Sequence, residues 1–302
     1  LTGKKTCEYT EATTGQLVNA ETKDWDDEVI SRLGYPREMF LPLSQPGTQV
    51  GVFTKEIEKE VGFSCQVVLP ATHDTASAVM AVPCQDCLYI SSGTWSLMGT
   101  ENKKAICTEE SRQKNFTNEG GYDFRYRYLK NIMGLWMIQS VRHEEKDQYS
   151  FAQLCEMADE CSDFPSRVFV NAQEFLAPES MTEAVRQYCE KSGQRVPETT
   201  GELAAVIYQS LAKCYGETVQ EIEQLTGEHY DTIHIVGGGA NADYLNRLTA
   251  SQSGRQVLAG PSEATAIGNL MAQMIGKGEF AGLMQARACV AESFPIREYQ
   301  KG

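Results

Sequence analysis

The sequence lacks any apolar run of the about 20 residues that a membrane-spanning helix needs. Its start, Leu1-Thr-Gly-Lys-Lys, has two lysines with no apolar segment behind them, so it does not read as a signal peptide. Basic residues are also few, with 27 Lys and Arg against 41 Asp and Glu and a net charge of −14. A surface this acidic repels nucleic-acid backbones. We therefore expect neither a membrane nor a nucleic acid as a partner.

Prolines are few as well, 10 in 302 residues, and there is no low-complexity segment or solenoid-like repeat. Hydrophobic residues make up 41% of the chain, which is enough for a large core and suggests about two domains. The chain begins with Leu rather than Met, which we read as a sign that it starts within a longer protein.

Ten cysteines are scattered along the chain, many of them in apolar stretches. In a chain of this size the pattern indicates buried, reduced thiols in a cytoplasmic enzyme. Cys84-Gln-Asp-Cys87 is the single C-x-x-C, and none of the four histidines stands at the spacing of a zinc site. We therefore expect two incidental thiols in a turn there, and no metal site.

Hydrophobic periodicity predicts loops and short helices before residue 70, then a meander of strands, and strands alternating with helices after residue 230. Such an order is typical of an α/β protein with a mixed sheet. We place the domain boundary in the loop at Pro83–Asp86, which divides the chain into 1–82 and 83–302. The expected strands are 66–69, 87–92, 95–99, 122–128, 232–236 and 255–258; of these, 66–69 should be buried, and 122–128, which alternates aromatic with charged residues, should be half-buried. The expected helices are 25–33, 73–82, 150–161, 181–190, 201–225, 243–250, 263–276 and one that starts at Ile132.

Asp74 stands where a helix is expected to begin, with His73 and Thr75 beside it. Its carboxylate could simply cap the helix by accepting a backbone N–H. It could instead accept the proton of a substrate hydroxyl, as a general base does. The segment alone leaves both interpretations open.

Two glycine-containing turns are candidates for phosphate binding. Ser92-Gly93-Thr94 joins two expected strands, and its backbone and Thr94 hydroxyl could donate to phosphate oxygens, although an ordinary hairpin turn has the same pattern. Gly237-Gly-Gly239 follows a strand, and with Ala242 it also fits the G-x-G-x-x-A pattern of Rossmann dinucleotide-binding folds, with Glu263 after the next strand. A dehydrogenase is therefore an alternative, although it leaves the two upstream motifs without a role.

Taken together and in this order, the motifs resemble the C-terminal half of FGGY carbohydrate kinases. The similarity runs along the whole chain, and two of the blocks are typical of the kinases that act on L-rhamnulose. The blocks are Leu1-Thr-Gly3, Trp25-Asp-Asp27, His73-Asp-Thr-Ala-Ser-Ala78, Leu88-Tyr-Ile-Ser-Ser-Gly-Thr-Trp-Ser-Leu-Met-Gly99, Thr117-Asn-Glu-Gly-Gly121, Leu129-Lys-Asn-Ile-Met-Gly-Leu-Trp136, His234-Ile-Val-Gly-Gly-Gly239 and Glu263-Ala-Thr265.

The resemblance implies an actin-like ATPase (ribonuclease H-like) fold whose two domains close on ATP and a sugar. Asp74 matches the family's catalytic base, which accepts the proton of a ketose 1-hydroxyl as it attacks the γ-phosphorus of ATP with the help of Mg²⁺. His73, Thr75 and Asn131 match substrate-side positions.

On the nucleotide side the resemblance assigns three residues. Thr94 would contact the phosphates, Gln139 would lie on the nucleotide side, and Gly238 falls in the adenosine motif. The family's N-terminal phosphate hairpin of the Asp-x-Gly type is absent, and so is the helix usual after Phe294-Pro-Ile296. We therefore expect either a fragment of the kinase, or a nucleotide-binding or regulatory domain without catalysis. A kinase for another ketose is a further alternative.

Overall fold

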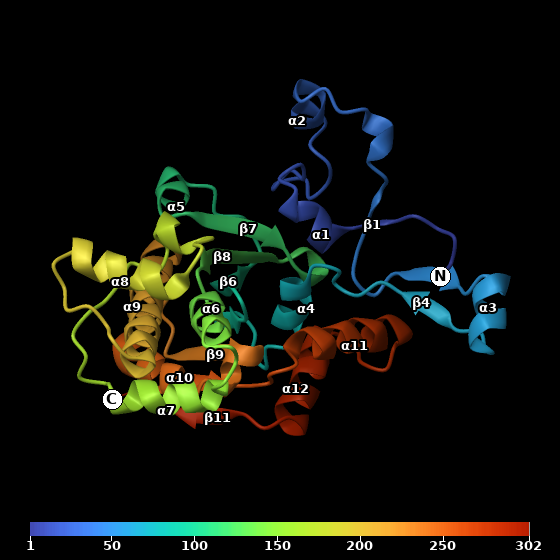
Figure 1. Cartoon of the computed structure of the whole chain (residues 1–302). Helices are drawn as coiled ribbons and strands as arrows, with labels where there is room; N and C mark the ends of the chain where they lie inside the picture. Colours follow the sequence, from blue (N-terminus) through green and yellow to red (C-terminus); the bar gives the residue numbers. More distant parts are fainter. Residues whose placement is uncertain (302) are drawn as a thin grey trace. The chain divides into compact units, whose positions relative to one another are not determined.

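The computed structural model describes residues 1–301, which form two compact units (Figure 1). The chain passes between the units several times, because β6 (Ser96–Asn102) and β8 (Tyr126–Ile132) each begin in one unit and end in the other. Unit 1 comprises residues Leu1–Asp86, Thr100–Leu129 and Glu263–Phe294, and unit 2 comprises Cys87–Gly99, Lys130–Ser262 and residues 295–301.

Unit 1 holds short elements, as the loop-rich pattern before residue 70 predicts. Several of its helices begin with a side-chain cap, such as Thr54, whose hydroxyl accepts from the Ile57 amide. The elements are β1 (Cys7–Glu8), α1 (Tyr9–Thr14), α2 (Asp27–Arg32), η1 (Arg37–Met39), β2 (Leu43–Ser44), β3 (Gln49–Val52), α3 (Lys55–Val61), β4 (Gln66–Val68), α4 (Asp74–Met80), α5 (Glu109–Gln113), β7 (Phe116–Gly120), η2 (Tyr122–Phe124), α11 (Ala264–Lys277) and α12 (Leu283–Ser293).

Helix α4 is held in unit 1 by α11 and α12. It packs on α11 (Figure 1) so closely that a β-carbon on Gly268 would lie 1.8 Å from the Ser77 carbonyl oxygen, so only glycine fits there. At the other end of α4, the buried Arg287 guanidinium donates to the carbonyls of Val79 and Met80. Its charge is balanced by Glu101, 2.7 Å away. A cation at these carbonyls also suits the helix dipole.

Unit 2 is built around the long helix α9 (Thr200–Thr226). A capping box between Thr199 and Glu202 starts this helix, and Gly227, with φ of 74°, ends it in the left-handed conformation. The other elements are β5 (Leu88–Ser92), α6 (Trp136–Glu144), α7 (Phe151–Glu160), η3 (Gln173–Phe175), α8 (Met181–Lys191), β9 (Thr232–Val236), η4 (Gly238–Asn241), α10 (Asp243–Ser253), β10 (Gln256–Ala259) and β11 (Arg297–Tyr299).

The principal sheet has seven strands in the order β11-β10-β9-β5-β6-β8-β7. Strand β9 runs parallel to both β10 and β5, whereas β5 pairs antiparallel with β6, and β10 with β11. The predicted hairpin around Gly93 and the predicted mixed sheet of an α/β protein are confirmed. A Rossmann domain would need a mostly parallel sheet in the order 3-2-1-4-5-6. The dehydrogenase alternative is therefore wrong.

Four local predictions are wrong: the strand at 122–128, its half-buried pattern, the helix from Ile132 and the buried strand at 66–69. Residues 122–128 do not form one alternating strand: Tyr122–Phe124 is a short 3₁₀ helix, and β8 continues to Ile132 before α6 begins at Trp136. Tyr126 through Leu129 are all buried, Arg127 included, so the aromatic–charged alternation does not mark a solvent face. Strand β4 has exposed and half-buried residues rather than buried ones, because it pairs with β3 alone.

The expectation of buried thiols holds for only part of the cysteines. Cys155 and Cys189 are buried, whereas Cys65, Cys107 and Cys289 are exposed. Within residues 1–301, every helix is too short or too polar to cross a membrane.

Candidate functional site

The first candidate site lies in unit 1, at the start of α4. His73 is the residue before the helix, and Asp74 is its first helical residue, so Asp74 does not occupy the capping position that one interpretation gave it. The Asp74 side chain is 78% exposed. Its Oδ1 accepts from the amide of Thr75 at 2.5 Å and from the Thr75 hydroxyl at 3.1 Å. The exposed Oδ2 can therefore receive an incoming hydroxyl.

His73 lies among three charged side chains, of which Arg127 is buried. Its Nδ1 lies 2.9 Å from Nη2 of Arg127 and 3.6 Å from Oε2 of Glu119, and its Nε2 lies 3.7 Å from Oδ1 of Asp74. Burial of the ring, and secondly the positive charge of Arg127, lower the pKa of His73 below its ordinary value. The imidazole is consequently neutral near pH 7.

The loop before α4 is fixed by the buried carboxylate of Glu8. Oε2 accepts from the amide of Thr72 at 3.0 Å and from its hydroxyl at 2.6 Å, while Oε1 accepts from the Thr10 amide at 2.9 Å. The Thr10 hydroxyl donates to Glu8 and accepts from the His73 amide at 3.3 Å. Because several donors converge on one carboxylate, the approach to His73 and Asp74 is rigidly set.

The second candidate site lies in unit 2, where β5 and β9 end. Since these strands are parallel, with Ser91 opposite Val236, the turn after β5 and the glycines after β9 meet at one edge. A β-carbon on Gly237 would lie 2.9 Å from the Ser92 carbonyl oxygen. The φ of Gly237 is +85°, a conformation that favours glycine. The two glycine turns therefore form one structure.

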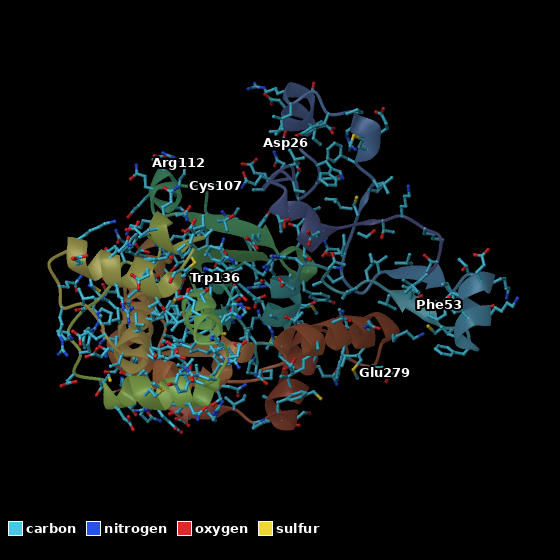
Figure 2. The ribbon with its side chains drawn as sticks, in the orientation of Figure 1. Asp26, Phe53, Cys107, Arg112, Trp136 and Glu279 are labelled. Carbon is cyan, nitrogen blue, oxygen red and sulfur yellow. The ribbon has the colours of Figure 1, made fainter. Side chains whose placement is uncertain are left out.

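Helix α6 starts directly on the β5–β6 turn. The Leu135 amide donates to the Gly93 carbonyl at 3.1 Å, and the Trp136 amide donates to the Thr94 carbonyl at 2.9 Å. Trp136, labelled in Figure 2, is the first residue of the helix, and Gln139 follows one turn later. Thr94 and Gln139 are thus carried by segments that are hydrogen-bonded to each other.

The surfaces that these segments offer are open. Thr94 and Gly238 are exposed, and a β-carbon on Gly238 would meet nothing within 4 Å. The space over Gly238 leaves room for a ligand, and the Thr94 hydroxyl can donate to phosphate oxygens. Asn131 is exposed near the end of β8, in the part of this strand that belongs to unit 2.

The structure brings the predicted residues together in two groups. His73, Asp74 and Thr75 are neighbours in unit 1, whereas Thr94, Gln139 and Gly238 share one edge of unit 2. Sequence reasoning missed Glu8, Glu119 and Arg127. Glu119 falls within the block Thr117–Gly121 noted above for its resemblance, and Arg127 falls just before the block that begins at Leu129. Arg127 was missed because charged residues of the alternating strand at 122–128 were expected to face solvent.

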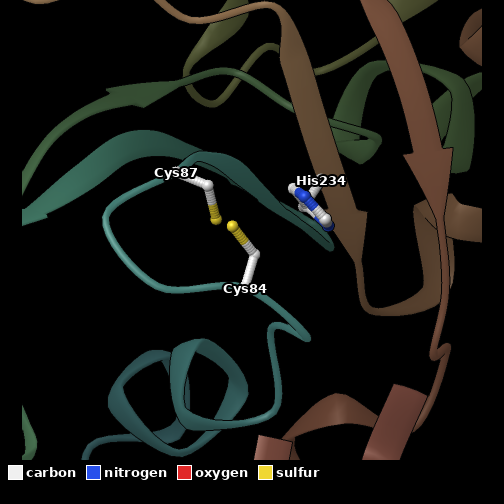
Figure 3. Close-up of side chains that lie close together, drawn as sticks. All are labelled: Cys84, Cys87 and His234. Atoms are coloured by element: carbon white, nitrogen blue, oxygen red, sulfur yellow. The ribbon is translucent and has the colours of Figure 1, made fainter. Parts of the chain in front are cut away.

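Two further features lie outside these groups. A cavity of about 410 Å³ in unit 1 is lined by residues such as Asn19, Cys107 and Arg112, the last two labelled in Figure 2, and by none of the predicted site residues. In unit 2, the thiol of Cys87 and a ring nitrogen of His234 lie within 4.8 Å of each other (Figure 3). Two side chains supply half of the ligands that a closed zinc site uses.

Comparison with known proteins gives matches along the whole chain. Residues 88–276 match the family model for the C-terminal domain of the FGGY family of carbohydrate kinases, and residues 1–81 match the model for its N-terminal domain. A rhamnulokinase from Halalkalibacterium halodurans is 48% identical over 99% of the chain, and one from Oceanobacillus iheyensis is 47% identical over 100% of it. The chain spans 64% of the length of each.

A solved structure is similar across the whole chain as well. The ligand-bound xylulose kinase from Lactobacillus acidophilus superposes with a TM-score of 0.74 at 14% sequence identity, covering 100% of this chain and 61% of that one. At this identity the likeness concerns the fold alone. It confirms the prediction of an actin-like fold with a mixed sheet flanked by helices.

Proposed function

The chain belongs to the FGGY family of carbohydrate kinases, and from this premise we propose that the protein is an L-rhamnulokinase. It transfers the γ-phosphoryl group of ATP to the 1-hydroxyl of L-rhamnulose, giving L-rhamnulose 1-phosphate and ADP. The similarity to two rhamnulokinases supports the choice of sugar. The observation that carries the reaction is the exposed carboxylate of Asp74, held through Oδ1 by Thr75 beside a neutral histidine.

In this reaction the sugar O1 forms a bond to the γ-phosphorus while the bond from that phosphorus to the β–γ bridging oxygen breaks. The hydroxyl proton passes to Oδ2 of Asp74, and ADP leaves with the bonding electron pair. Phosphoryl transfer has a loose transition state, so the hydroxyl becomes acidic only late in transfer. A carboxylate therefore suffices as the base.

We assign the sugar to His73, Asp74, Thr75 and Asn131. His73 and Thr75 supply polar groups on either side of the base, and Asn131 supplies an exposed amide that can both donate and accept. Hydrogen bonds to several hydroxyls of one sugar fix the orientation of its reacting oxygen, which is how much of the rate in such a transfer arises.

We assign ATP to Thr94, Gln139 and Gly238. The open space over Gly238 accommodates the nucleoside, and the hydroxyl of Thr94 reaches phosphate. Neither Ser91–Trp95 nor Gly237–Asn241 contains a lysine or arginine. The phosphate charge is therefore met by backbone N–H groups and by the Mg²⁺ that enters with ATP as the MgATP substrate.

We further propose that residues 1–82 form the end of the sugar-binding domain and that 83–302 form the nucleotide-binding domain. The protein would work in the cytoplasm, where its ten cysteines stay reduced. A second candidate function is nucleotide binding without catalysis, favoured by the grouping of Thr94, Gln139 and Gly238 at one edge of unit 2.

A coupled assay of ADP release with L-rhamnulose separates these candidates. It should be run on this chain and on the protein as its gene encodes it, with L-xylulose and glycerol as alternative acceptors. Turnover that is fastest with L-rhamnulose supports the proposal. Binding of MgADP without turnover of any acceptor in the gene-encoded protein would favour the second candidate, and turnover that is fastest with another acceptor would refute the assigned sugar.

A further inference from the structure

Arg127 is a buried cation aimed at a residue of the proposed sugar site. It lies on β8, and its side chain is only 1% exposed. Nε donates to the Gly120 carbonyl at 3.1 Å, and Nη2 lies 2.9 Å from Nδ1 of His73. Nη1 lies 3.1 Å from Oε2 of Glu119, in an ion pair whose geometry is not that of a hydrogen bond. Burying a guanidinium is costly unless its donors and charge are used.

The contact between Arg127 and His73 has one chemical reading. A guanidinium can only donate, so Nδ1 of His73 must accept. A neutral imidazole carries one proton, which must then be on Nε2. We propose that Arg127, charge-paired with Glu119, fixes His73 as the Nε2–H tautomer, so that the imidazole serves as a hydrogen-bond donor to the sugar beside the base. The identity of the sugar that accepts this hydrogen bond rests on the proposed function. The tautomer of His73 does not depend on it.

The charges around His73 favour the neutral ring. The positive charge of Arg127 on β8 disfavours protonation of the His73 ring. Three carboxylates favour it: Glu119 on β7, Asp74 on α4 and Glu11 on α1. Burial and the guanidinium outweigh the three carboxylates, and the pKa of His73 is lowered. The donor on Nε2 is thus available without an added charge near the phosphoryl group.

The position of Nε2 gives this donor a purpose. Nε2 is 3.7 Å from Oδ1 of Asp74, which is too far for a direct hydrogen bond. A sugar hydroxyl next to Asp74 can instead accept from Nε2–H. Arg127 touches neither substrate nor base in this arrangement, and it acts as a positioning residue through His73.

The tautomer is measured directly by long-range ¹H–¹⁵N correlation spectra of the full-length enzyme labelled at histidine. His73→Gln identifies the His73 signals among those of the other histidines. In the unsubstituted protein we expect an acceptor-type shift at Nδ1 and a protonated Nε2 at pH 7. A protonated Nδ1 would overturn the inference, with no reference to activity.

Variants then separate positioning from a general structural role. Arg127→Met should let both tautomers appear, raise the His73 pKa and raise the KM for L-rhamnulose by about tenfold, the loss expected for one hydrogen bond, with the KM for ATP unchanged. Arg127→Lys keeps the charge and one donor, and it should largely restore the tautomer. Arg125→Met is the matched control. Arg125 stands two residues before Arg127 in the sequence, but it pairs with Asp86 rather than with His73.

Glu119→Gln provides a test should Arg127→Met not fold. It removes the carboxylate but leaves the Arg127 donor, so the Nε2–H tautomer should persist while the His73 pKa falls further. A switch of tautomer in Glu119→Gln, or an unchanged tautomer in Arg127→Met, would refute the role of Arg127. If the tautomers behave as expected but L-rhamnulose is not phosphorylated, the proposed function fails and the positioning of His73 stands.

Discussion

Gly239 lies against Ser92 so closely that a β-carbon on Gly239 would be 1.9 Å from the Ser92 hydroxyl oxygen. Gly237 meets the backbone of the same serine, whereas Gly238 between them faces open space. Two of the three consecutive glycines therefore let the chain after β9 pass close to Ser92 at the end of β5. The middle one has no such structural need, which makes it the informative position for nucleotide binding.

Gly238→Val should weaken ATP binding by about tenfold to a hundredfold, because its side chain would fill the space assigned to the nucleoside and overpacking typically costs about 1–3 kcal/mol. Thermal stability should change little. Gly282→Val, at another glycine whose β-carbon would meet nothing within 4 Å, is the control. Titration with MgADP measures the affinity, and an unaltered Kd in both Gly238→Val and Thr94→Ala would remove the nucleotide assignment.

Asp74→Asn should lower kcat by about a hundredfold to ten-thousandfold, the usual contribution of a general base, while MgADP binding stays intact. The side chain is 78% exposed, so its replacement by an amide of the same shape should leave the unfolding temperature nearly unchanged. Steady-state kinetics of the full-length enzyme check this result. Turnover close to that of the unsubstituted enzyme would exclude Asp74 as the base.

Arg287→Met should destabilise unit 1 by about 3–5 kcal/mol, because Glu101 would remain buried without its partner. Adding Glu101→Gln should recover part of the loss, since it removes the unpaired charge. Urea denaturation of the four proteins in this cycle gives the coupling energy. If the two single substitutions had additive effects, the pair would not act as a unit in holding the end of α4.

The lowered pKa of His73 predicts a pH dependence of stability. Below the pKa of about 6.5 that a histidine has in an unfolded chain, the unfolded state binds a proton that the native state does not. Stability is therefore fully present above about pH 6.5 and declines as the pH falls towards the lower pKa of the folded state. His73→Gln should flatten this decline, whereas His143→Gln, at a histidine whose side chain is 86% exposed, should not. Denaturation midpoints between pH 7 and pH 5 decide the matter.

The expectation that the protein holds no metal can be tested at Cys87. This residue lies near His234 and follows Cys84 by three positions (Figure 3). Protein purified without chelators should contain substoichiometric zinc by elemental analysis. Cys87→Ser should then leave the zinc content and the unfolding temperature unchanged. One zinc per chain that is lost in Cys87→Ser would show that Cys87 is a zinc ligand after all.

Local sequence patterns predicted the elements whose ends are set by residues close to them in the sequence. The capping box at Thr199 and the glycine at Gly227 delimit α9 within two residues of the range expected from sequence. The alternation of strands and helices after residue 230 likewise predicted β9, α10, β10 and α11 with small shifts at their ends. The predicted assignments of Asp74, Asn131, Thr94 and the other site residues stay predictions, to be settled by the variants above.

The sequence by itself determined the fold class, the hairpin around Gly93 and the family, because hydrophobic periodicity and short motifs are written in consecutive residues. Only the tertiary structure decided that Arg127 is buried against His73 and that Glu8 anchors the loop before Asp74. Both arrangements join residues more than 50 positions apart. The sequence alone does not distinguish a charged residue that becomes buried from one that stays in solvent, because the difference is the partner that folding brings next to it.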